Sequence, residues 1–480
     1  MSKKLYYMRD KDIDIVNENV DNIIEKAKNR EIEMIEPTID EFKKVKSVIL
    51  DFIRKEKRII YGGYAWNQLV KKKSPNQTFY KDNDYTDVEF YSNTPIEDLV
   101  KLCNILSSKG FKYIQGKSAQ HDETYTIFVN FNGYCDITYM PSNIYYTVMT
   151  ETINGLRLIH PKFILVDLLR QFTDPINSFR RLDKNIKRGK LIMKNYPLDL
   201  EDTEPILTNL NKSVHNLINN LLPEIIKIQN IIFIGQIAYN TFLNPNINIK
   251  SQKTIYDYSL IEIISSNLKH DIKLIYNLLV KYFLTIEKNN NFNDTILLNQ
   301  YHTYFQFIDK KAVFKYNGEI FLTILGNNER CNPYHEITLE HNNKSYNIKI
   351  ATFNLLFMYN LIKYHYAITF KDKDMKKLQD QIMYQLLTSR DNFLNSNNKT
   401  VIDNTIFEDF TITCIGTPIS SMRKFMLSRR DRKLMPRSAI HPYDPDEKKD
   451  NFPFDSYYFN NTSGNIINNP KDLIYNPKHE

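Results

Sequence analysis

The chain has 480 residues, 42% of them hydrophobic, and it carries a formal net charge of +8 with a sequence pI near 8.9. This length predicts two or three domains, each with its own core, and the basic balance fits a polyanionic partner. The sequence shows neither an apolar signal segment nor an uncharged apolar run long enough to span a membrane, so we expect neither secretion nor membrane insertion.

The cysteines give a second exclusion. Four of them are scattered along the chain with no C-x-x-C pair: Cys103, Cys135, Cys331 and Cys414. This spacing predicts neither a zinc site nor a disulfide framework. We therefore expect a protein that works in a reducing, intracellular setting.

Two helices are expected before the first strand. Apolar residues within 11–35 return at the i, i+3, i+4, i+7 spacing of an amphipathic helix. The segment 39–57 has the same pattern, with charged residues lining its opposite face. We expect residues 1–57 to form an N-terminal helical region.

The most informative stretch of the chain is 59–92. A short apolar strand, IIY, leads into Gly62-Gly63, and a helix should open directly after these glycines. A second strand carries Asp87 and Glu89 two residues apart, so both carboxylates point to the same face. Glycines at a helix start let backbone N–H groups approach a phosphate, and paired carboxylates offer the hard oxygen ligands that Mg²⁺ binds.

A third acid follows on a later pair of strands. The segment 128–140 reads FVNFNGYCDITYM, in which Asn-Gly is a strong turn dipeptide. Asp136 should lie on the second strand, on the same face as Tyr134 and Thr138. Taken singly, such acids are more often solvated surface residues, and Gly-Gly is more often a simple turn. Their order and spacing together favour a site for two-metal phosphoryl or nucleotidyl transfer.

The order Gly-Gly, Asp-x-Glu and a lone later Asp resembles the polymerase-beta-like nucleotidyltransferase superfamily. The phrases YGGYAWN, TDVEFYS, YCDITYM, HPKFILVDLLRQF and SFRRLDK resemble the poly(A) polymerase catalytic subunits of large cytoplasmic DNA viruses, most of all the mimivirus type and more distantly the poxvirus type. This resemblance covers residues 59–190. It implies an α/β (α+β) nucleotidyltransferase fold, a mixed sheet with flanking helices, that uses ATP and holds Mg²⁺ or Mn²⁺ on Asp87, Glu89 and Asp136.

Two positions depart from the superfamily pattern. Glu89 stands where many members have Asp, which changes the reach of the metal ligand. Gly63 stands where a serine often contacts the phosphates, so that contact must come from backbone N–H groups or from a neighbour such as Asn67. The resemblance implies that Gly62 and Gly63 face the β- and γ-phosphates of ATP.

Basic residues gather after the third acid. A helix is expected near 162–172, because His160-Pro161 precedes it and proline favours a helix start. By charge and position, the candidates for phosphate or RNA contacts are Lys162, Arg170 and Arg181. A basic set then recurs at helical spacing and forms either a solvated surface or an RNA-binding face; its members are Arg180, Lys184, Lys187 and Arg188.

The chain also contains an internal repeat. The segment IFIGQIAYN matches IIYGGYAWN at an offset of 173 residues, and the same offset carries DYTDVEFYS onto DYSLIEIIS. Asp87 then falls on Leu260, whereas Glu89 meets Glu262. Aligning NGYCDIT with NGEIFLT places Asp136 on Phe321. We expect a second copy of the fold that has lost two carboxylates and cannot catalyse; chance similarity between two Ile- and Asn-rich strands is the alternative.

The C-terminal part of the chain has a different character. Seven basic residues lie within 422–437, and a tail rich in Asn, Asp and Pro follows, which we expect to be extended or disordered. The basic cluster either binds RNA phosphates or is solvated. The expected domains are an N-terminal helical region (1–57), a catalytic domain (58–195), a degenerate copy (196–400) and a basic segment with a tail (401–480).

These features together predict an enzyme, a template-independent polynucleotide adenylyltransferase that adds AMP from ATP to RNA 3′ ends. The resemblance implies a role in viral mRNA polyadenylation, a homodimer, and a place in the virion or in a cytoplasmic factory of the host cell. Another terminal RNA nucleotidyltransferase, of the uridylyl or CCA-adding type, is an alternative. A nonenzymatic RNA-binding subunit is a further one, against which the intact first set of acids argues.

Overall fold

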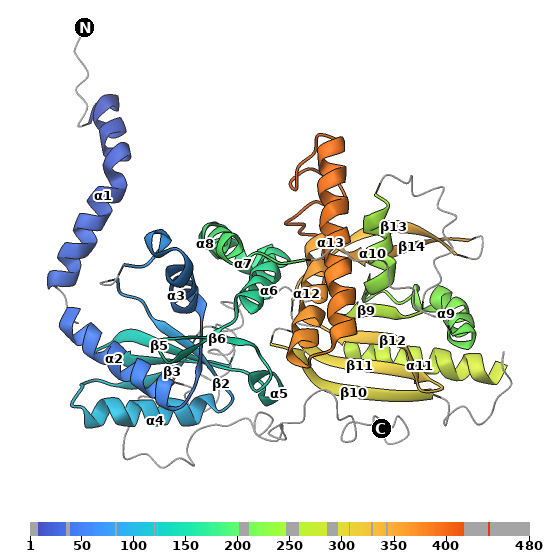
Figure 1. Ribbon diagram of the computed structural model, residues 1–480, viewed down its shortest axis with the longest axis horizontal. Coiled ribbons are helices and arrows are strands. Elements are labelled where there is room, and N and C mark those ends of the chain that lie inside the picture. The colour runs from blue at the N-terminus through green and yellow to red at the C-terminus, as the bar shows by residue number, and fades with distance from the viewer. Residues whose placement is uncertain are drawn as a thin grey trace, which may run out of the picture.

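Two units, each built on an eight-stranded mixed sheet with flanking helices, lie side by side (Figure 1). The computed structural model describes residues 8–34, 39–81, 84–119, 121, 123–200, 211–245, 259–285, 296–306, 308–327, 330–341, 344–416 and 440–441. Among the helices of these ranges, none is both long enough and apolar enough to cross a membrane.

The first sheet has the strand order β16-β3-β4-β5-β2-β1-β7-β6. At its centre β2 runs antiparallel to β1 and parallel to β5, which places the start of β2 beside the middle of β5. The strands are β1 (Ile59–Tyr61), β2 (Val88–Ser92), β3 (Gln115–Ser118), β4 (Thr124–Val129), β5 (Asn132–Tyr139), β6 (Thr150–Ile153), β7 (Leu156–Ile159) and β16 (Ile440–His441).

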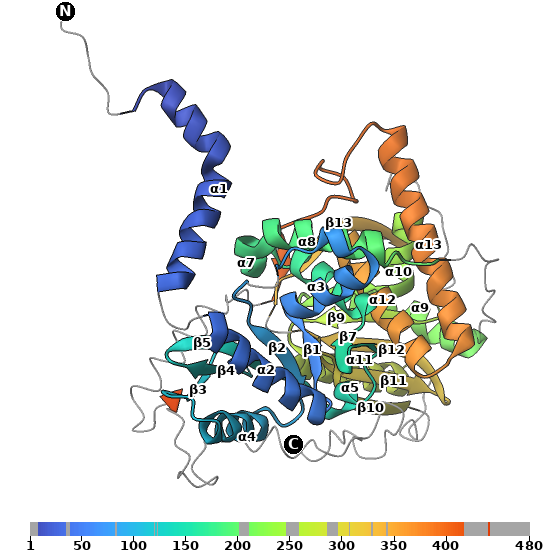
Figure 2. The same cartoon turned by 60° about the vertical axis from the view of Figure 1, so that its left-hand side comes forward.

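The helices of the first unit differ in how they are packed. The second, α2, buries Phe42 and Ile49 in the core together with α4, so it belongs to the first unit. The first, α1, projects from the body (Figure 2) and contacts it through an ion pair of 2.5 Å between Glu25 and Lys81. The helices are α1 (Asp10–Met34), α2 (Ile39–Lys55), α3 (Gly62–Lys73), α4 (Pro95–Ser108), α5 (Ser142–Tyr145), α6 (Pro161–Phe172), α7 (Pro175–Ser178) and α8 (Leu182–Asn195), with 3-10 turns at Pro75–Gln77 and Phe179–Arg181.

A β-bulge between β4 and β5 changes the face to which Tyr134 points. The pairing shifts after Ile127, so that Tyr134 becomes the extra residue on β5. Its ring stacks on Phe42 of α2 in the core, with 5.7 Å between the ring centroids. The prediction that Tyr134 shares the face of Asp136 is therefore wrong, because strict alternation holds only in a regular strand.

The second unit repeats this architecture with the strand order β10-β11-β12-β9-β8-β14-β13-β15. Its strands are β8 (Ile231–Ile234), β9 (Ile261–Ser265), β10 (Ile296–Phe305), β11 (Ile308–Tyr316), β12 (Glu319–Gly326), β13 (Asn332–His341), β14 (Lys344–Ala351) and β15 (Cys414–Ile415). Its helices are α9 (Lys212–Ile225), α10 (Gly235–Leu243), α11 (Leu268–Thr285), α12 (Phe353–Thr369) and α13 (Lys373–Ser396).

The strand registers confirm the predicted duplication. β1 pairs with β2, and β8 pairs with β9, in the same antiparallel register, in which the residue before the glycine faces Glu89 or Glu262. The glycine after each first strand has a positive φ, +65° at Gly62 and +64° at Gly235, a conformation that other residues rarely adopt. The two copies therefore share a backbone turn as well as a sequence pattern.

The predicted counterpart of Asp136 in the second copy is wrong by two residues. Asp136 on β5 pairs with Glu89 on β2, whereas Thr323 on β12 pairs with Glu262 on β9. Phe321 is instead a fully buried core residue. The insertion between β9 and β12 shifts the offset, and a match of seven residues could not locate it. Threonine, like phenylalanine, lacks the carboxylate of Asp136.

The two units meet where α6 packs against α12. The ring of Phe163 on α6 lies 5.1 Å from that of Phe305 on β10, measured between centroids. Nearby, Gln306 donates from Nε2 to the carbonyl oxygen of Tyr139 at 2.8 Å. The second unit thus packs directly against the first unit.

Residues 401–416 pack on the second unit. Phe407 is fully buried, with ring centroids 5.5 Å from Phe242 and 5.6 Å from Phe353. β15 then pairs with β13. The boundary expected after residue 400 therefore does not coincide with a break in packing. The basic cluster within 422–437 lies outside the described residues, as does the tail from residue 442.

One disulfide was not anticipated. Cys331 and Cys414 are 83 residues apart in sequence, and their sulfur atoms are joined beside the pairing of β13 with β15, with 5.3 Å between the Cα atoms. Cys103 and Cys135 are free and buried. The prediction of no disulfide framework was wrong for this pair. The two cysteines become neighbours only because β13 pairs with β15, which their spacing in the sequence does not indicate.

Candidate active site

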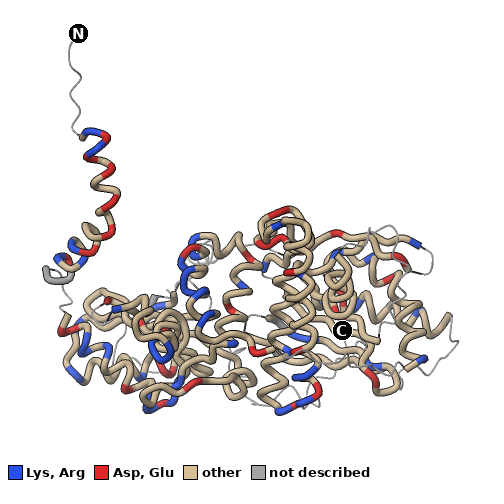
Figure 3. Tube along the Cα trace, turned by 45° about the horizontal axis from the view of Figure 1, so that its top comes forward, with Lys and Arg blue, Asp and Glu red and all other residues tan. Residues whose placement is uncertain are grey.

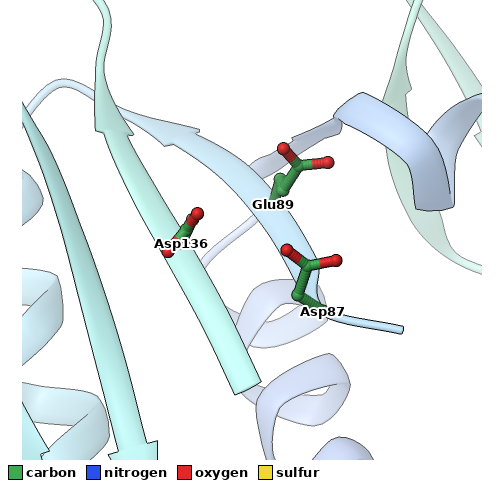
Figure 4. A group of neighbouring side chains, drawn as sticks. All are labelled: Asp87, Glu89 and Asp136. Carbon is green, nitrogen blue, oxygen red and sulfur yellow. The ribbon is translucent and has the colours of Figure 1, made fainter. Parts of the chain in front are cut away.

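Three carboxylates converge at the start of β2. Glu89 on β2 lies opposite Asp136 on β5, and Asp87 comes just before β2. One oxygen of each lies within 4.8 Å of the others, and Figure 4 shows the three side chains reaching into the same space. Asp87 is exposed, whereas the other two are partly buried. This arrangement brings together all three acids that the sequence singled out.

The electrostatics of this group fit a divalent cation. Burial, reinforced by the negative charge of Asp87, raises the pKa of Glu89 to about 7. Burial also raises the pKa of Asp136, against a hydrogen bond donated by the Thr126 hydroxyl. Carboxylates held this close repel one another when all are ionised, and a cation bound between them removes that repulsion. Asp87, Glu89 and Asp136 therefore match the ligand preference of a divalent cation in chemical type and in spacing.

The raised pKa of Glu89 gives a testable pH dependence. The folded-state pKa, about 7, lies above the ordinary value of 4.5, so the folded protein binds this proton more tightly than the unfolded chain. Glu89 therefore favours folding fully below about pH 4.5, and that contribution is lost as the pH rises through 7. Without divalent cations, we expect unfolding free energy to fall by about 3 kcal/mol between pH 5 and pH 8 from this group.

Denaturant unfolding in EDTA at several pH values measures this effect. Glu89→Gln has no titrating group at this position, so its stability should decline less over the same pH range. Divalent cation added at pH 8 should restore stability to the unaltered protein more than to the variant. Identical pH profiles for the two proteins would contradict the assignment.

The two glycines shape the position of Glu89. A Cβ atom at Gly62 would overlap the Glu89 carboxylate, and the Gly63 N–H donates to Glu89 Oε2 at 2.9 Å. Together with its positive φ, this close approach explains why position 62 is a glycine. The N–H group of Gly63, expected to face phosphate, is occupied by the carboxylate in this structure.

Asn67 was expected to contact phosphate, but the structure places its amide elsewhere. Its Oδ1 accepts hydrogen bonds from the backbone N–H groups of Phe79 and Tyr80, each at 3.0 Å. The side chain is 6% exposed. Asn67 therefore fixes the loop after α3, and this loop brings Tyr80 to the site.

Cationic side chains from α8 and the preceding turn interact with the carboxylates through their charge. The charge of Arg181 lowers the pKa of both Glu89 and Asp136, and its Nη2 lies 3.0 Å from His121 Nε2. Burial lowers the pKa of Lys184, as do Arg188 and Arg181, whereas the acids of the site oppose this. Figure 3 shows basic residues gathered along this helix. These cations can offset the charge of a polyphosphate.

The predicted basic face 180–188 is divided in the structure. The charge of Lys184 interacts with Asp87 and Glu89, and Arg188 lies beside Gly63. Lys187 pairs with Asp183 at 3.1 Å on the exposed side, and Arg180 lies over the ring of Phe179 in the preceding 3-10 turn. The pattern predicted one continuous helix, but α8 begins at Leu182.

Two further sequence candidates lie at the junction of the units. Lys162 donates from Nζ to the Tyr364 hydroxyl at 2.9 Å, which links α6 to α12. Arg170 pairs with Asp167 at 2.6 Å and lines a small cavity with Phe305. The structure thus joins these cations to the second unit and to α6 rather than to the three carboxylates.

In the second copy, lysines occupy the neighbourhood of the remaining acid. Glu262 is paired with Lys363 of α12 at 2.6 Å, and both side chains are largely buried. Burial lowers the pKa of the nearby Lys311 to about 8, while Glu262 raises it. With Leu260 and Thr323 in place of two acids, the equivalent positions balance one carboxylate with lysine charge and, within the described residues, present no ligand set for metal ions.

Comparisons with known families cover most of the chain. Residues 46–178 match the family described as "Poly(A) polymerase catalytic subunit". Residues 192–477 match the family described as "APMV, Putative poly(A) polymerase, catalytic subunit, C-terminal". The first match contains the three carboxylates, and the second contains the degenerate copy.

Individual relatives agree. A protein of Acanthamoeba polyphaga mimivirus named "Putative poly(A) polymerase catalytic subunit" is 32% identical over 500 residues, which cover 98% of this chain and 84% of the relative. A protein of the same name from African swine fever virus (isolate Pig/Kenya/KEN-50/1950) is 31% identical over 173 residues, 35% of this chain and 36% of the relative. The crystal structure of the Megavirus polyadenylate synthase superposes with a TM-score of 0.81 at 30% identity, covering 100% of this chain and 95% of that one.

The likeness extends over nearly the whole chain, and three carboxylates converge in the first unit. The chain therefore belongs to the family of viral poly(A) polymerase catalytic subunits and is a polynucleotide adenylyltransferase.

Proposed function

We propose that this protein extends RNA 3′ ends with AMP from ATP, without a template, during viral mRNA polyadenylation. The observation that carries the proposal is the convergence of Asp87, Glu89 and Asp136 within 4.8 Å beside the cations of α8. The first unit performs the chemistry in this proposal, and the second copy serves as an inactive support.

The chemistry joins the RNA 3′ oxygen to the α-phosphorus of ATP as the bond to pyrophosphate breaks. Two Mg²⁺ or Mn²⁺ ions held by Asp87, Glu89 and Asp136 would activate the attacking hydroxyl and stabilise the leaving oxygen. The Gly63 N–H holds Glu89 in place for this role, and the Thr126 hydroxyl does the same for Asp136. Arg181, Lys184 and Arg188 would offset the charge of the triphosphate and of the departing pyrophosphate.

An incorporation assay on a short RNA tests this function. We expect the full chain to add AMP when supplied with ATP and Mg²⁺ or Mn²⁺, to add much less of the other three nucleotides, and to add nothing in EDTA. Preferential addition of UMP, or an ordered CCA addition, would instead support another terminal RNA nucleotidyltransferase. No addition of any nucleotide would contradict the proposed function.

We also propose that the protein forms a homodimer, through α1. This helix exposes between 36% and 50% of each large apolar side chain on a single stripe: Ile13, Val16, Val20, Ile23 and Ile24. Residues 13, 16, 20, 23 and 27 follow the alternating three- and four-residue spacing of a two-stranded coiled coil, so the same stripe on a second copy would cover it.

Light scattering after size exclusion tests this proposal on the full chain. We expect a dimer for the unaltered protein and a monomer for Val16→Glu/Val20→Glu, because two charges in the stripe oppose its burial. A matched control, Asn22→Glu/Asn29→Glu, adds the same charges to the opposite face and should remain dimeric. A monomeric unaltered protein, or loss of the dimer in both variants, would contradict a role for this stripe.

A further inference from the structure

The space above Gly63 is filled by the side chains of Tyr80 and Arg188. A Cβ atom at this position would lie 2.6 Å from the Tyr80 hydroxyl and 3.1 Å from Arg188 Nη1. A contact of 2.6 Å is too short for any real side chain, and the Gly63 backbone has no positive φ that would itself demand glycine. A side chain at position 63 would therefore fit only if Tyr80 or Arg188 moved away.

The Tyr80 hydroxyl is held firmly in that place. Asn67 binds the backbone N–H groups of Phe79 and Tyr80, which fixes the loop. The guanidinium of Arg188 lies over both rings, 4.3 Å from the centroid of Phe79 and 4.8 Å from that of Tyr80. Restraint from two sides means that the hydroxyl is positioned before any ligand binds.

The hydrogen bonding of Tyr80 leaves its proton available. Arg188 donates from Nη2 to the Tyr80 hydroxyl oxygen at 3.0 Å, so the tyrosine acts as the acceptor in this pair. Burial raises the pKa of Tyr80 above its ordinary value, although the charge and hydrogen bond of Arg188 lower it, so the hydroxyl keeps its proton at neutral pH. A polarised O–H beside a guanidinium matches a phosphate oxygen, which accepts several charge-assisted hydrogen bonds.

We propose that the Tyr80 hydroxyl, with Arg188, binds the triphosphate of ATP in the place that a hydroxyl-bearing side chain at position 63 would otherwise fill. This inference rests on the proposed function, because it assigns a substrate contact to the same site. It accounts for the glycine at 63, for the amide of Asn67 and for the stacking of Arg188 with one contact. The phosphate-binding hydroxyl comes from the loop after α3 instead of from the start of the helix.

Three variants and one control test this exchange. Tyr80→Phe removes only the hydroxyl, and Gly63→Ser adds a side chain whose Cβ atom collides with the Tyr80 hydroxyl. Gly63→Ser/Tyr80→Phe moves the hydroxyl from the loop to the helix start. Tyr196→Phe is the matched control, because its hydroxyl also contacts α3, where it donates to the Leu69 carbonyl oxygen at 2.9 Å.

Equilibrium binding separates this contact from catalysis. For the full chain we expect Tyr80→Phe to weaken binding of inorganic triphosphate and of an ATP analogue with a methylene bridge between the α- and β-phosphates roughly tenfold, the effect of one hydrogen bond to a charged group. Binding of AMP, which lacks the β- and γ-phosphates, should not change. In the incorporation assay, KM for ATP should rise more than kcat falls. Tyr196→Phe should behave like the unaltered protein in all of these measurements.

The double variant gives the sharper outcome. Gly63→Ser/Tyr80→Phe should bind triphosphate more tightly than either single variant, because the serine hydroxyl then enters the vacated space. Unchanged triphosphate binding in Tyr80→Phe, an equal loss of AMP binding, or a double variant no better than Tyr80→Phe would overturn the proposal. Binding is measured independently of AMP transfer, so an unaltered protein that adds no AMP would refute the proposed function and leave this inference to be judged by triphosphate binding.

Discussion

Asp136→Asn is expected to lower the rate of AMP incorporation by about a thousandfold while leaving the chain folded. The substitution preserves the shape of the side chain, and the amide oxygen can still accept from the Thr126 hydroxyl. It removes one of the three charges that lie within 4.8 Å of one another, so a metal ion at this site would lose a ligand. Single-turnover incorporation at saturating ATP and RNA measures the loss.

The stability of the same variant distinguishes a catalytic role from a structural one. Buried carboxylates that repel one another destabilise the fold, so removing one should leave the melting temperature equal or higher. Glu97→Gln, an exposed acid in the first turn of α4, is the control and should change neither rate nor stability. Retained activity in Asp136→Asn would exclude the three-carboxylate assignment, and a large fall in melting temperature would show that Asp136 serves the fold.

Glu262→Ala is expected to have the opposite signature, a loss of about 3 kcal/mol of stability with little change in the rate of the folded enzyme. Glu262 and Lys363 face each other at 2.6 Å in a largely buried setting. Truncating the acid leaves the ammonium group of Lys363 buried without this counter-charge, and it also removes a negative charge that raises the pKa of Lys311. Denaturant unfolding measures the stability, and incorporation well below the melting temperature measures the rate.

A second substitution in the same pair identifies the cause. Glu262→Ala/Lys363→Met removes both charges, so it should be less destabilised than Glu262→Ala alone if the buried lysine charge is responsible. Equal stability of the two variants would attribute the effect to lost packing instead. A thousandfold loss of rate in a folded Glu262→Ala protein would mean that the second copy takes part in the chemistry.

The sequence predicted those parts of the site that arise from short stretches of chain. A strand, a glycine turn and a helix start are local features, and Asp87 and Glu89 share a face because strand residues alternate. The ungapped offset of 173 residues predicted the second copy for the same reason, since both turns and both first strand pairs recur with identical spacing. These predictions needed no knowledge of which strands become neighbours elsewhere.

Other expectations failed where register or packing decided the outcome. The alignment that placed Asp136 on Phe321 missed Thr323, because pairing with β9 sets the register of β12 and a short local match does not. Tyr134 does not share the face of Asp136, because a β-bulge interrupts the pairing of β4 with β5. The disulfide between Cys331 and Cys414 joins residues that no spacing motif relates.

The sequence by itself thus determined the family, the duplicated fold and the three candidate acids, since short contiguous motifs indicate all of these. Only the tertiary structure decided which groups surround those acids. Tyr80 and Arg188 meet above Gly63 although 108 residues separate them. Asn67, which the sequence suggested as a phosphate ligand, instead accepts a hydrogen bond from the backbone of Tyr80. Such contacts arise when helices and loops that are distant in sequence pack on one sheet edge. The periodicity of a single segment does not predict which distant segments will pack against it.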